Sequence, residues 1–475
     1  MTTVLHLTIG ESRAVPRLWL EGVSLARAGL EIGAVYALDD QRKLSSGLKL
    51  NRVDESYQGQ TFHVSKRKRG GKLYPLMEIR SHRLREAFEG IEKVRVALLD
   101  GDIVITAHHV DVNIVQRTRR ILKKVRDGAA LAVCSLFHGG GVLDKALHHG
   151  MRRAGVESFV QVGSEMSERY LESSRRNNPE LWKPASIALQ GDIRDVDWRL
   201  LPQCDVLAGG VPCTGASIAG RAKNQLSAAE EHEAAGALFF DYLEAVKTLN
   251  PAVVVLENVP QYQSTASMMV IRSVLTSLGY QLSEAILDGN DYGALERRRR
   301  LIVVGVCRGL GARFDFDQVK PLRTKELTLR DILEPLALDS ERWRPHEGLE
   351  AKAVRDKEAG KGFATQFLTG DEGHCGTIGK GYARRRSTEP FLLHPDNPKL
   401  SRIFTPVEHA RVKGIPESVA AGECDTIAHE IYGQSGVYPK FEAIGAGIGW
   451  LIDSLASVVL PGRQYSLAFP KVVGL

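Results

Sequence analysis

The sequence is poor in cysteine, and its few cysteines are not arranged as a metal site. Six cysteines lie scattered among 475 residues, with no Cys-x-x-Cys pair and no histidine at metal-ligand spacing. This pattern argues against a zinc site and against a disulfide framework, and we expect no metal. A chain of this length can bury full-sized hydrophobic cores in two or three domains, so disulfides are not needed for stability. Unpaired cysteines are typical of a reducing, cytoplasmic compartment.

Segments that would direct the chain to a membrane are also missing. The first 20 residues contain no charged segment that leads into a long apolar run. No later stretch is apolar enough to cross a bilayer. We therefore expect a soluble cytoplasmic protein, associated with the nucleoid if it binds DNA, with no membrane partner.

The chain has no strong net charge. Its 63 basic residues exceed its 57 acidic residues by only six, which permits nucleic-acid binding without requiring it. Basic residues gather locally at 65–72 (SKRKRGGK), 297–300 (RRRR) and 384–386 (RRR). Each of these clusters predicts either a nucleic-acid contact or a solvated surface.

Residues 1–127 read as a β-rich accessory module in which one pattern occurs twice. An apolar strand, a short helix and a second apolar segment are found around PRLWLEG and GAVYAL, and again around YPLMEIR and VRVALLDGDIVIT. This repeat resembles the swapped-hairpin folds of the AbrB and SymE type. The resemblance implies a module that contacts DNA or dimerises, and the alternative is a structural addition. The oligomeric state stays open.

From residue 128 the pattern changes to apolar strand, glycine turn and amphipathic helix. Strands that are apolar without alternation, each followed by a helix, predict a parallel sheet covered on both faces over 128–308. Ligands bind beyond the carboxyl ends of such strands. Four short motifs fall at that rim, namely FHGGG, GSE, GGVPC and LENVP.

The remaining chain divides into two further parts. Residues 309–429 are polar and punctuated by glycine over most of their length, which predicts a small loop-rich domain. Residues 430–475 regain helical apolar spacing, and we expect this last helix to complete the core by packing back on the main sheet.

The rim motifs suit an adenosine-containing cofactor. The FHGGG turn lets backbone amides approach a ligand closely. Glu165 ends the second strand, where a carboxylate can accept hydrogen bonds from ribose hydroxyls. Asp192 and Ile193 follow the third strand and suit an adenine amino group and ring face. The pattern G-x-G-x-x-G is absent, which argues against an NAD enzyme.

Cys213 and Glu257 lie after neighbouring strands of the predicted sheet. Cys213 follows Pro212 in the loop after the fourth strand, and Glu257 ends the fifth. A thiolate and a carboxyl group at one rim can act as a nucleophile and a general acid. Taken singly, Cys213 is also consistent with a small buried hydrophobe, and Glu257 with a helix cap or an ion pair.

Five segments between about residues 130 and 460 resemble the cytosine-5 DNA methyltransferases, in the usual unpermuted order of that family. They correspond to the Pro-Cys loop, the Glu-Asn-Val motif, the Gln-x-Arg-x-Arg motif, the helix that follows the recognition domain and the segment that closes the cofactor pocket. In the same order, the matching segments are GGVPCTGASIAGR, LENV, YGALERRRRLIVVG, RIFTPVEHARVKGIPE and YGQSGVYPKFEAIG.

The resemblance implies an α/β fold: a Rossmann-like S-adenosylmethionine-dependent methyltransferase core, a small loop-rich target-recognition domain and, outside the match, the β-rich N-terminal module. It also implies base flipping, since the target ring cannot be reached inside a duplex. The Cys213 thiolate would add to C6 of a cytosine in duplex DNA while Glu257 holds and protonates N3. Arg298 would contact the base at O2, Arg300 would support the loop, and Asn258 would order the Cys213 loop.

The resemblance assigns the binding residues as well. S-adenosylmethionine would be the cofactor, and double-stranded DNA the partner. The implied cofactor residues are Phe137, Gly139, Gly141, Glu165, Asp192, Ile193, Pro212 and Ser435. The DNA-binding candidates, in the segment TIGKGYARRRSTEP, are Tyr382, Arg384, Arg385 and Arg386.

Six positions depart from the family pattern, and they bear on cofactor affinity and loop closure. The nucleophile, the general acid and both arginines are kept, so we expect an active enzyme of restriction-modification or of phage or host DNA modification. The alternatives are a non-catalytic DNA-binding regulator on the same scaffold and a tRNA cytosine-5 methyltransferase. The departures are Ser135, Val142, Val211, Thr214, Glu296 and Gln434.

Overall fold

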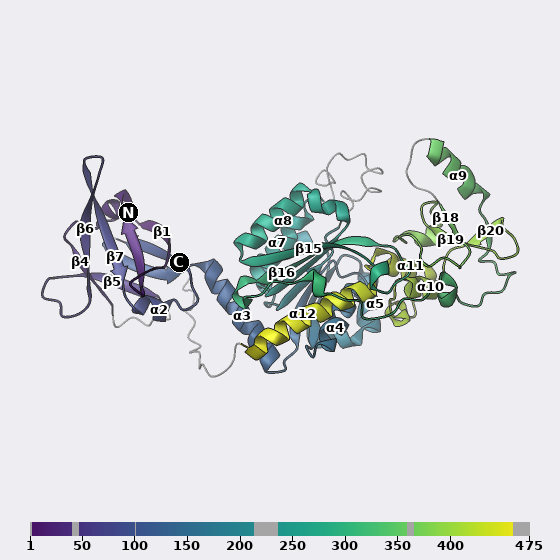
Figure 1. Ribbon diagram of the computed structural model, residues 1–475, viewed down its shortest axis with the longest axis horizontal. Helices are drawn as coiled ribbons and strands as arrows, with labels where there is room; N and C mark the ends of the chain where they lie inside the picture. Colours follow the sequence, from purple (N-terminus) through teal and green to yellow (C-terminus); the bar gives the residue numbers. More distant parts are fainter. Residues whose placement is uncertain (1, 40–46, 100, 213–235, 359–364, 459–475) are drawn as a thin grey trace. The chain divides into compact units, whose positions relative to one another are not determined.

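The computed structural model describes residues 2–39, 47–99, 101–212, 236–358 and 365–458 (Figure 1). The contacts between residues divide the chain into two compact units, and the boundary along the chain lies between Gln116 and Arg117. The sequence pattern predicted this boundary at residue 127. Residues 309–429 and the C-terminal helix belong with the predicted core in the second unit. Among the described residues, no helix is long and apolar enough to span a bilayer.

The first unit repeats one order of elements, as the sequence pattern predicted. The first copy holds β1 (Thr3–Thr8), β2 (Gly10–Ser12), β3 (Val15–Glu21), α1 (Val23–Arg27), β4 (Val35–Leu38) and β5 (Leu48–Val53). The second copy holds β6 (Thr61–Arg69), β7 (Lys72–Arg80), α2 (Arg83–Ala87), β8 (Lys93–Leu99) and β9 (Asp102–Ala107).

The two copies exchange strands. β1 of the first copy pairs with β8 of the second, and β6 of the second pairs with β4 of the first. The strand order β1-β8-β9-β5-β4-β6-β7-β3-β2 begins and ends with strands that only Ile9 separates in the chain, so the sheet closes on itself around one apolar core. The resemblance to the AbrB and SymE type stays a prediction.

The second unit is built on a seven-stranded sheet of order β12-β11-β10-β13-β14-β16-β15. Its strands are β10 (Leu131–Leu136), β11 (Ser158–Glu165), β12 (Trp182–Gln190), β13 (Val206–Gly209), β14 (Val253–Asn258), β15 (Tyr280–Asp288) and β16 (Arg299–Cys307). The expectation of a wholly parallel sheet was wrong in one strand, because β16 runs antiparallel to both of its neighbours. The short connection over 289–298 returns the chain directly beside β15, whereas a parallel return needs a longer crossover.

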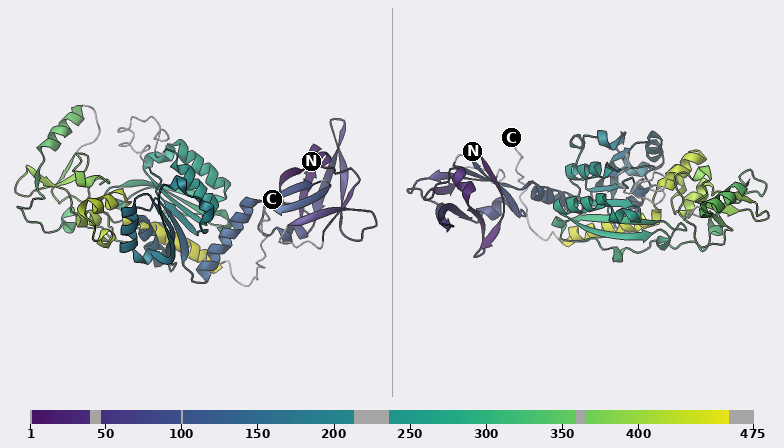
Figure 2. Two further views of the ribbon diagram at one scale, coloured as in Figure 1. Left: turned by 180° about the vertical axis from the view of Figure 1, so that it is seen from behind. Right: turned by 90° about the horizontal axis from the view of Figure 1, so that it is seen from above.

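Helices cover both faces of this sheet. Figures 1 and 2 show α7 (Leu238–Leu249) and α8 (Ala266–Ser277) on one face, and α4 (Val142–Arg153) with α12 (Tyr438–Val458) on the other. α5 (Glu168–Asn177) follows β11. Because both faces are covered, the strands are apolar without alternation. The last helix therefore returns to the core as predicted, although its main neighbour is α4.

Glycines let α4 and α12 approach closely. A Cβ atom at Gly150 would lie 2.0 Å from the carbonyl oxygen of Glu442, and one at Gly445 would lie 2.5 Å from that of Leu147. Any side chain at either position would force the helices apart. This close contact fixes the C-terminal helix against the helix that follows the predicted cofactor turn.

Residues 309–429, called the recognition region below, are loop-rich, as predicted. They surround a small sheet of order β17-β20-β19-β18. Tyr382, Phe404 and Leu392 are among the residues of its own apolar core. Its elements, and the helices that lead back to the core, are β17 (Arg344–Pro345), α9 (Glu347–Glu358), β18 (Gln366–Leu368), β19 (Pro390–Leu393), β20 (Leu400–Arg402), α10 (Pro406–Val412) and α11 (Asp425–Gln434).

The helix α3 (His109–Arg126) is anchored in the second unit from Arg117 onward. Arg117 is buried and donates to the carbonyl oxygen of Leu278 at 2.6 Å. Arg120 donates to the buried carboxylate of Asp205 at 2.9 Å. A buried carboxylate is stable here because cations and a backbone amide replace its water.

Candidate active site

The carboxyl ends of four strands are aligned in one row. Leu136 of β10 pairs with Ser164 of β11 and with Gly209 of β13, and Gly209 pairs with Leu256 of β14. The residues one step further along the chain therefore share one rim. They are Phe137, Glu165, Gly210 and Glu257, which come from the four motifs that the sequence pattern placed there.

The turn after β10 has an unusual backbone. Gly139 and Gly141 adopt positive φ angles of 57° and 76°, which glycine reaches without strain. Phe137 also adopts a positive φ, of 57°, which is uncommon for a residue with a side chain. Strained backbone of this kind gathers at ligand sites, where the surrounding structure holds it in place.

A buried hydrogen-bond network holds this turn. The Ser135 hydroxyl donates to a carboxylate oxygen of Asp144 at 2.7 Å. The His138 ring is hydrogen-bonded through Nδ1 to Ser135 at 2.9 Å and through Nε2 to the Ser174 hydroxyl at 2.8 Å. Ser135 stands where the related family has aspartate, and Asp144 of α4 brings a carboxylate to the same network. The departure at Ser135 is thus accommodated locally.

Glu165 and Asp192 lie at the strand ends that the sequence predicted. Glu165 accepts hydrogen bonds from the backbone amides of Gly139 at 2.8 Å and Ser167 at 2.9 Å, which ties the second strand end to the glycine turn. Hydrogen bonds from Arg194 lower the pKa of Asp192 to about 2, so this carboxyl group is ionised at neutral pH. Ile193 is buried beside it.

Gln434, rather than Ser435, faces the glycine turn. A Cβ atom at Gly139 would lie 3.2 Å from Nε2 of Gln434, and this amide nitrogen is buried with no hydrogen-bond partner among the described residues. The Ser435 hydroxyl instead donates to the carbonyl oxygen of Ile431 at 2.6 Å. An unpaired buried donor beside a glycine turn and an acidic strand end fits a ligand that carries acceptor and hydroxyl groups. The sequence had marked Gln434 only as a departure.

Glu257 forms an ion pair with Arg300. The distance from Arg300 Nε to Glu257 Oε1 is 2.9 Å, and both side chains are largely buried. Gly210 borders the other carboxylate oxygen, since a Cβ atom there would lie 3.0 Å from Glu257 Oε2. A side chain at position 210 would therefore displace the carboxylate. Glu257 is thus held in one orientation at the start of the Pro-Cys loop.

Asn258 is hydrogen-bonded at the start of that loop. Its side-chain amide donates to the carbonyl oxygen of Val211 at 3.0 Å, and its own oxygen accepts from the backbone amide of Val259 at 2.8 Å. Pro212 is the last residue described on this side, and the predicted nucleophile Cys213 lies outside the described residues.

Arg298 occupies a different place from Arg300. Its guanidinium group is buried and donates to the carbonyl oxygens of Ile378 at 3.2 Å and Gly433 at 3.3 Å. It therefore joins the recognition region to α11. Arg300, by contrast, lies against Glu257.

A second buried ion pair lies next to Arg298. Lys413 Nζ is 2.8 Å from Glu296 Oε2, and both side chains are fully buried. The other oxygen of Glu296 accepts from the backbone amide of Ile378 at 2.8 Å. Burial alone would raise the pKa of Glu296, but the charges of Lys413 and Arg298 hold it below its usual value.

Lys440 is a third buried cation near these groups. Its Nζ lies 3.4 Å from the carbonyl oxygens of Leu287 and Arg298. Burial lowers the pKa of Lys440 to about 7, the neighbouring Glu257 opposes this shift, and Arg300 adds to it. No sequence pattern singled out Lys440, because a lysine in an apolar helix reads as a surface position until its packing is known.

A match to a known family decides the classification. A family model described as "C-5 cytosine-specific DNA methylase" matches residues 131–450. The chain belongs to this family. The motifs quoted from the sequence predicted the same family, and residues 1–130 lie outside the match.

Individual relatives agree with this assignment. The type II methyltransferase M1.ScrFI of Lactococcus lactis subsp. cremoris is 29% identical over 263 residues, which are 54% of this chain and 64% of that protein, slightly less than two thirds of its length. The type II methyltransferase M.HhaI of Haemophilus parahaemolyticus is 28% identical over 272 residues, which are 55% of this chain and 80% of that protein. The crystal structure of S. pombe Dnmt2 methyltransferase has the same fold, with a TM-score of 0.51 at 18% identity over 69% of this chain and 99% of that one.

Two of the predicted DNA-binding residues have structural contacts instead. Tyr382 is fully buried, and its hydroxyl donates to the carbonyl oxygen of Pro390 at 2.8 Å. This contradicts a contact between Tyr382 and DNA. Arg385 donates to the carbonyl oxygen of Ser401 at 3.2 Å and packs over Phe391. Arg384 and Arg386 are exposed and stay candidates.

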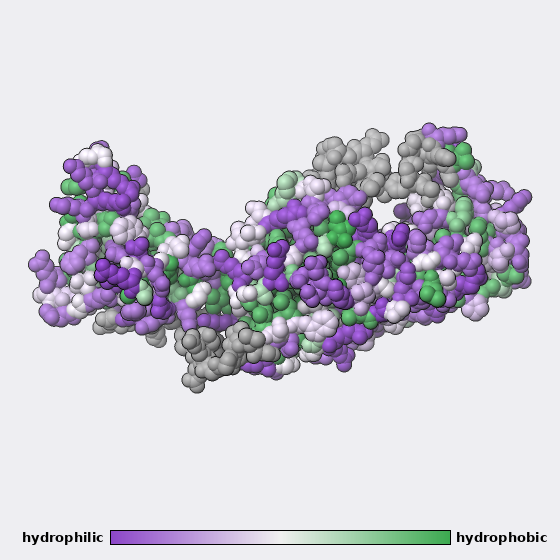
Figure 3. Space-filling model, viewed as in Figure 1, coloured by the Kyte–Doolittle hydropathy of each residue, from purple (hydrophilic) through white to green (hydrophobic). Residues whose placement is uncertain are grey.

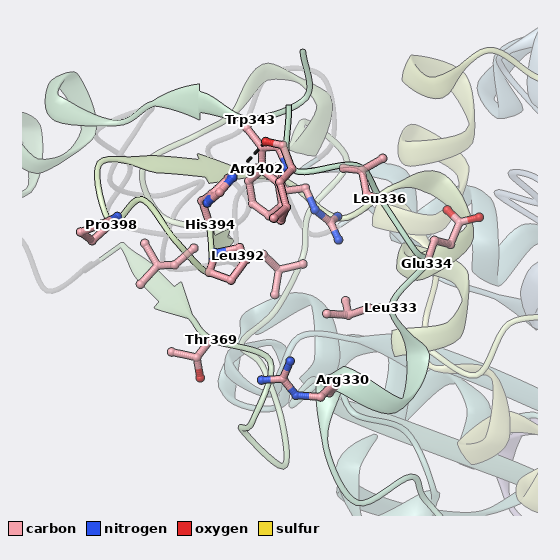
Figure 4. A pocket seen from close by; sticks show the side chains of 13 residues that line it. Arg330, Leu333, Glu334, Leu336, Trp343, Thr369, Leu392, His394, Pro398 and Arg402 are labelled. Carbon is pink, nitrogen blue, oxygen red and sulfur yellow. Dashed lines mark hydrogen bonds between the residues drawn. The ribbon is translucent and has the colours of Figure 1, made fainter. Parts of the chain in front are cut away.

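The recognition region also contains a cavity of about 490 Å³ (Figure 4). Trp343 and His394 pack together in it with ring centroids 4.8 Å apart, and Leu333 and Arg330 lie further along. None of the residues that line it belongs to the strand rim that carries Glu257, so we assign it no part in the reaction. Among the described residues, no group of three or more metal-ligating side chains could hold a metal ion.

The buried pair Glu296–Lys413 leads to a double-mutant prediction. We expect Glu296→Gln and Lys413→Met each to lower the free energy of unfolding by about 3–5 kcal/mol, because each leaves one buried charge without its partner. The double variant should lose clearly less free energy of unfolding than the sum of the two single losses. Urea unfolding of the full chain measures all four proteins. Additive effects would show that the pair is not coupled.

The buried Lys440 leads to a pH prediction. Below pH 7 the folded protein holds the Lys440 amine charged in a buried site, whereas at higher pH the folded state holds this amine neutral. Its destabilising effect is therefore complete below pH 7 and declines as the pH rises from 7 towards the ordinary lysine value of 10.5. We expect Lys440→Met to stabilise the fold more at pH 6 than at pH 9, as measured by urea unfolding.

Lys399→Met is the matched control for Lys440→Met, because Lys399 is exposed. Its effect on the free energy of unfolding should be small and equal at the two pH values. A gain from Lys440→Met that is the same at pH 6 and pH 9 would contradict the prediction.

Proposed function

We propose that this chain transfers a methyl group from S-adenosylmethionine to C5 of a cytosine in duplex DNA, through a covalent bond between Cys213 and C6. The observation that carries the proposal is the fixed carboxylate of Glu257, held by Arg300 and bordered by Gly210 where the Pro-Cys loop begins. The family match over 131–450 supports the same chemistry.

The residue types explain how a weakly nucleophilic carbon could react. Cytosine C5 is a poor nucleophile until the Cys213 thiolate adds to C6 and Glu257 donates a hydrogen bond and a proton to N3. Arg300 lies beside Glu257 and can hold the base oxygen O2. S-adenosylmethionine, when bound, supplies the methyl group. A base then takes the C5 proton, the C5–C6 double bond forms again as Cys213 leaves as a thiolate, and N3 returns its proton to Glu257.

The target base must leave the helix before Cys213 can reach it. Enzymes that modify a base rotate it out of the stack into a pocket. Glu257 and Arg300 are both largely buried, so they suit a base that has left the duplex.

The glycine turn and its neighbours would hold the cofactor. Gly139 and Gly141 allow close backbone approach, and Glu165 is placed to accept hydrogen bonds from ribose hydroxyls. The unpaired amide of Gln434 can donate to an acceptor group of the ligand. We add Gln434 to this set. The other proposed members are Phe137, Asp192, Ile193, Pro212 and Ser435.

The recognition region would choose the sequence context. Arg384 and Arg386 are exposed and carry side chains that bind phosphate or guanine edges. The relatives named above are type II methyltransferases, so we place the activity in restriction-modification. A cytoplasmic site of action, on nucleoid DNA, follows from the proposed substrate. The family match does not favour transfer RNA or a non-catalytic role.

The first experiment measures methyl transfer and covalent trapping. Full-length protein with labelled S-adenosylmethionine should label cytosine in mixed-sequence duplex DNA, and transfer RNA should not compete. DNA with 5-fluorocytosine should trap the protein, because fluorine at C5 blocks the release of Cys213. Cys213→Ser should abolish both label and trapping. Cofactor binding without any label in DNA would refute the proposal.

The second experiment separates the two arginines. We expect Arg300→Gln to lower kcat at saturating DNA by about a hundredfold, because the reacting base loses a positioned cation. Arg298→Gln should change kcat by less than about tenfold and act mainly on the free energy of unfolding, because Arg298 joins two carbonyl groups. A larger loss of kcat from Arg298→Gln would reverse the assignment.

A further inference from the structure

The strands β6 and β7 continue beyond the barrel as a two-stranded ribbon. β6 pairs with β4 only through Thr61–His63, and β7 pairs with β3 only from Leu76 onward. The stretch from Lys66 to Arg69 pairs with Lys72–Pro75 alone. Figure 1 shows this hairpin reaching away from the other strands of its unit.

The two faces of the ribbon differ. Alternation along β6 continues the core-facing side of Phe62 and Val64 with Lys66 and Lys68, which are exposed. Leu73 of β7 lies directly opposite Lys68 and is 55% exposed. In Figure 3 the surface over this hairpin is mostly hydrophilic. Residues 65–72 contain five basic side chains and no acidic one.

The opposite face carries arginines that are already paired. Arg67 and Arg69 both form ion pairs with Glu21, the latter at 2.7 Å. The Trp19 indole also donates to Glu21 at 3.1 Å, and these partners together hold the pKa of Glu21 below its usual value. Within the described part of the chain, no ion pair or side-chain hydrogen bond engages Lys66 or Lys68.

We propose that the face of the ribbon formed by Lys66, Lys68 and Leu73 binds duplex DNA along the major groove. That groove admits a two-stranded antiparallel ribbon, unpaired lysines neutralise phosphates, and an exposed leucine can contact thymine methyl groups. The choice of duplex DNA as the partner rests on the proposed function. The lysine contacts to phosphate would add affinity that does not depend on sequence, and the choice of the target cytosine would stay with the recognition region.

The test compares three double variants of the full chain. Lys66→Gln/Lys68→Gln removes the unpaired charges, and Arg67→Gln/Arg69→Gln removes the paired ones on the other face. Arg13→Gln/Arg80→Gln removes two exposed charges at the opposite end of β3 and β7. Binding to a labelled 30-base-pair duplex is measured by anisotropy between 0.05 and 0.3 M salt. Methyl transfer at saturating DNA reports whether the second unit of each variant is folded, and thermal unfolding reports whether the first unit, which carries the substitutions, is folded.

The lysine variant should lose about 1.8 from the slope of log affinity against log salt, at about 0.9 for each phosphate contact. If both proteins bind equally at about 1 M salt, this change of slope makes the affinity of the lysine variant about 30-fold lower at about 0.15 M salt. Transfer at saturating DNA should be unchanged, and the other two variants should lose clearly less affinity. An unchanged slope, or an equal loss in all three variants, would overturn the proposal.

The result of this binding test can be distinguished from the result of the test of the proposed function. A protein that transfers no methyl group to DNA but binds it with a lysine-dependent slope would refute the activity and keep the ribbon contact. In that case, circular dichroism would report folding in place of methyl transfer. A protein that methylates DNA, but whose affinity for DNA does not depend on Lys66 and Lys68, would support the activity and refute the ribbon contact. A lysine variant that lost affinity for anionic vesicles but not for DNA would assign the face to lipid and overturn the proposal.

Discussion

One buried carboxylate, that of Glu296, holds the recognition region to the start of β16 in the main sheet. A charge that is fully removed from water is tolerated only where other groups replace its hydration. Glu296 receives the cation of Lys413 from the end of α10 and the backbone amide of Ile378 from the recognition region. Arg298 lies beside it and binds two further carbonyl groups. The polypeptide around Arg300 is therefore positioned by a set of charges that must all be present together.

The glycine turn shows how a departure from a family pattern can leave the local chemistry intact. Ser135 is too short to reach the groups that a carboxylate at its position would reach. Asp144, from the first turn of α4, extends a carboxylate to the Ser135 hydroxyl, and His138 connects this pair to Ser174 of α5. The network is buried, so each member constrains the rotamer of the next. The strained backbone at Phe137 rests on this support.

Much of the site could be predicted from the sequence, because it depends on where strands end. Unbroken apolar runs followed by glycine or acidic residues located Glu165 and Glu257, and parallel pairing then brings such positions to one rim. The direction of β16 could not be predicted, since an apolar run does not reveal which neighbour it joins. The burial of Tyr382 could not be predicted for a related reason. In a loop-rich region the path of the chain decides whether an aromatic or an arginine points to solvent or into a core, and residue type alone does not.

The strand exchange in the N-terminal barrel has a consequence for its synthesis. The first copy of the repeat cannot complete its own sheet, because β1 pairs with β8 and β4 pairs with β6, and both of these partners belong to the second copy. Pairings between residues so distant in the chain are slow to form. When the first 60 residues leave the ribosome, their strand edges therefore remain open until the second copy has been translated. At this stage the open strand edges can pair with other chains or be bound by chaperones.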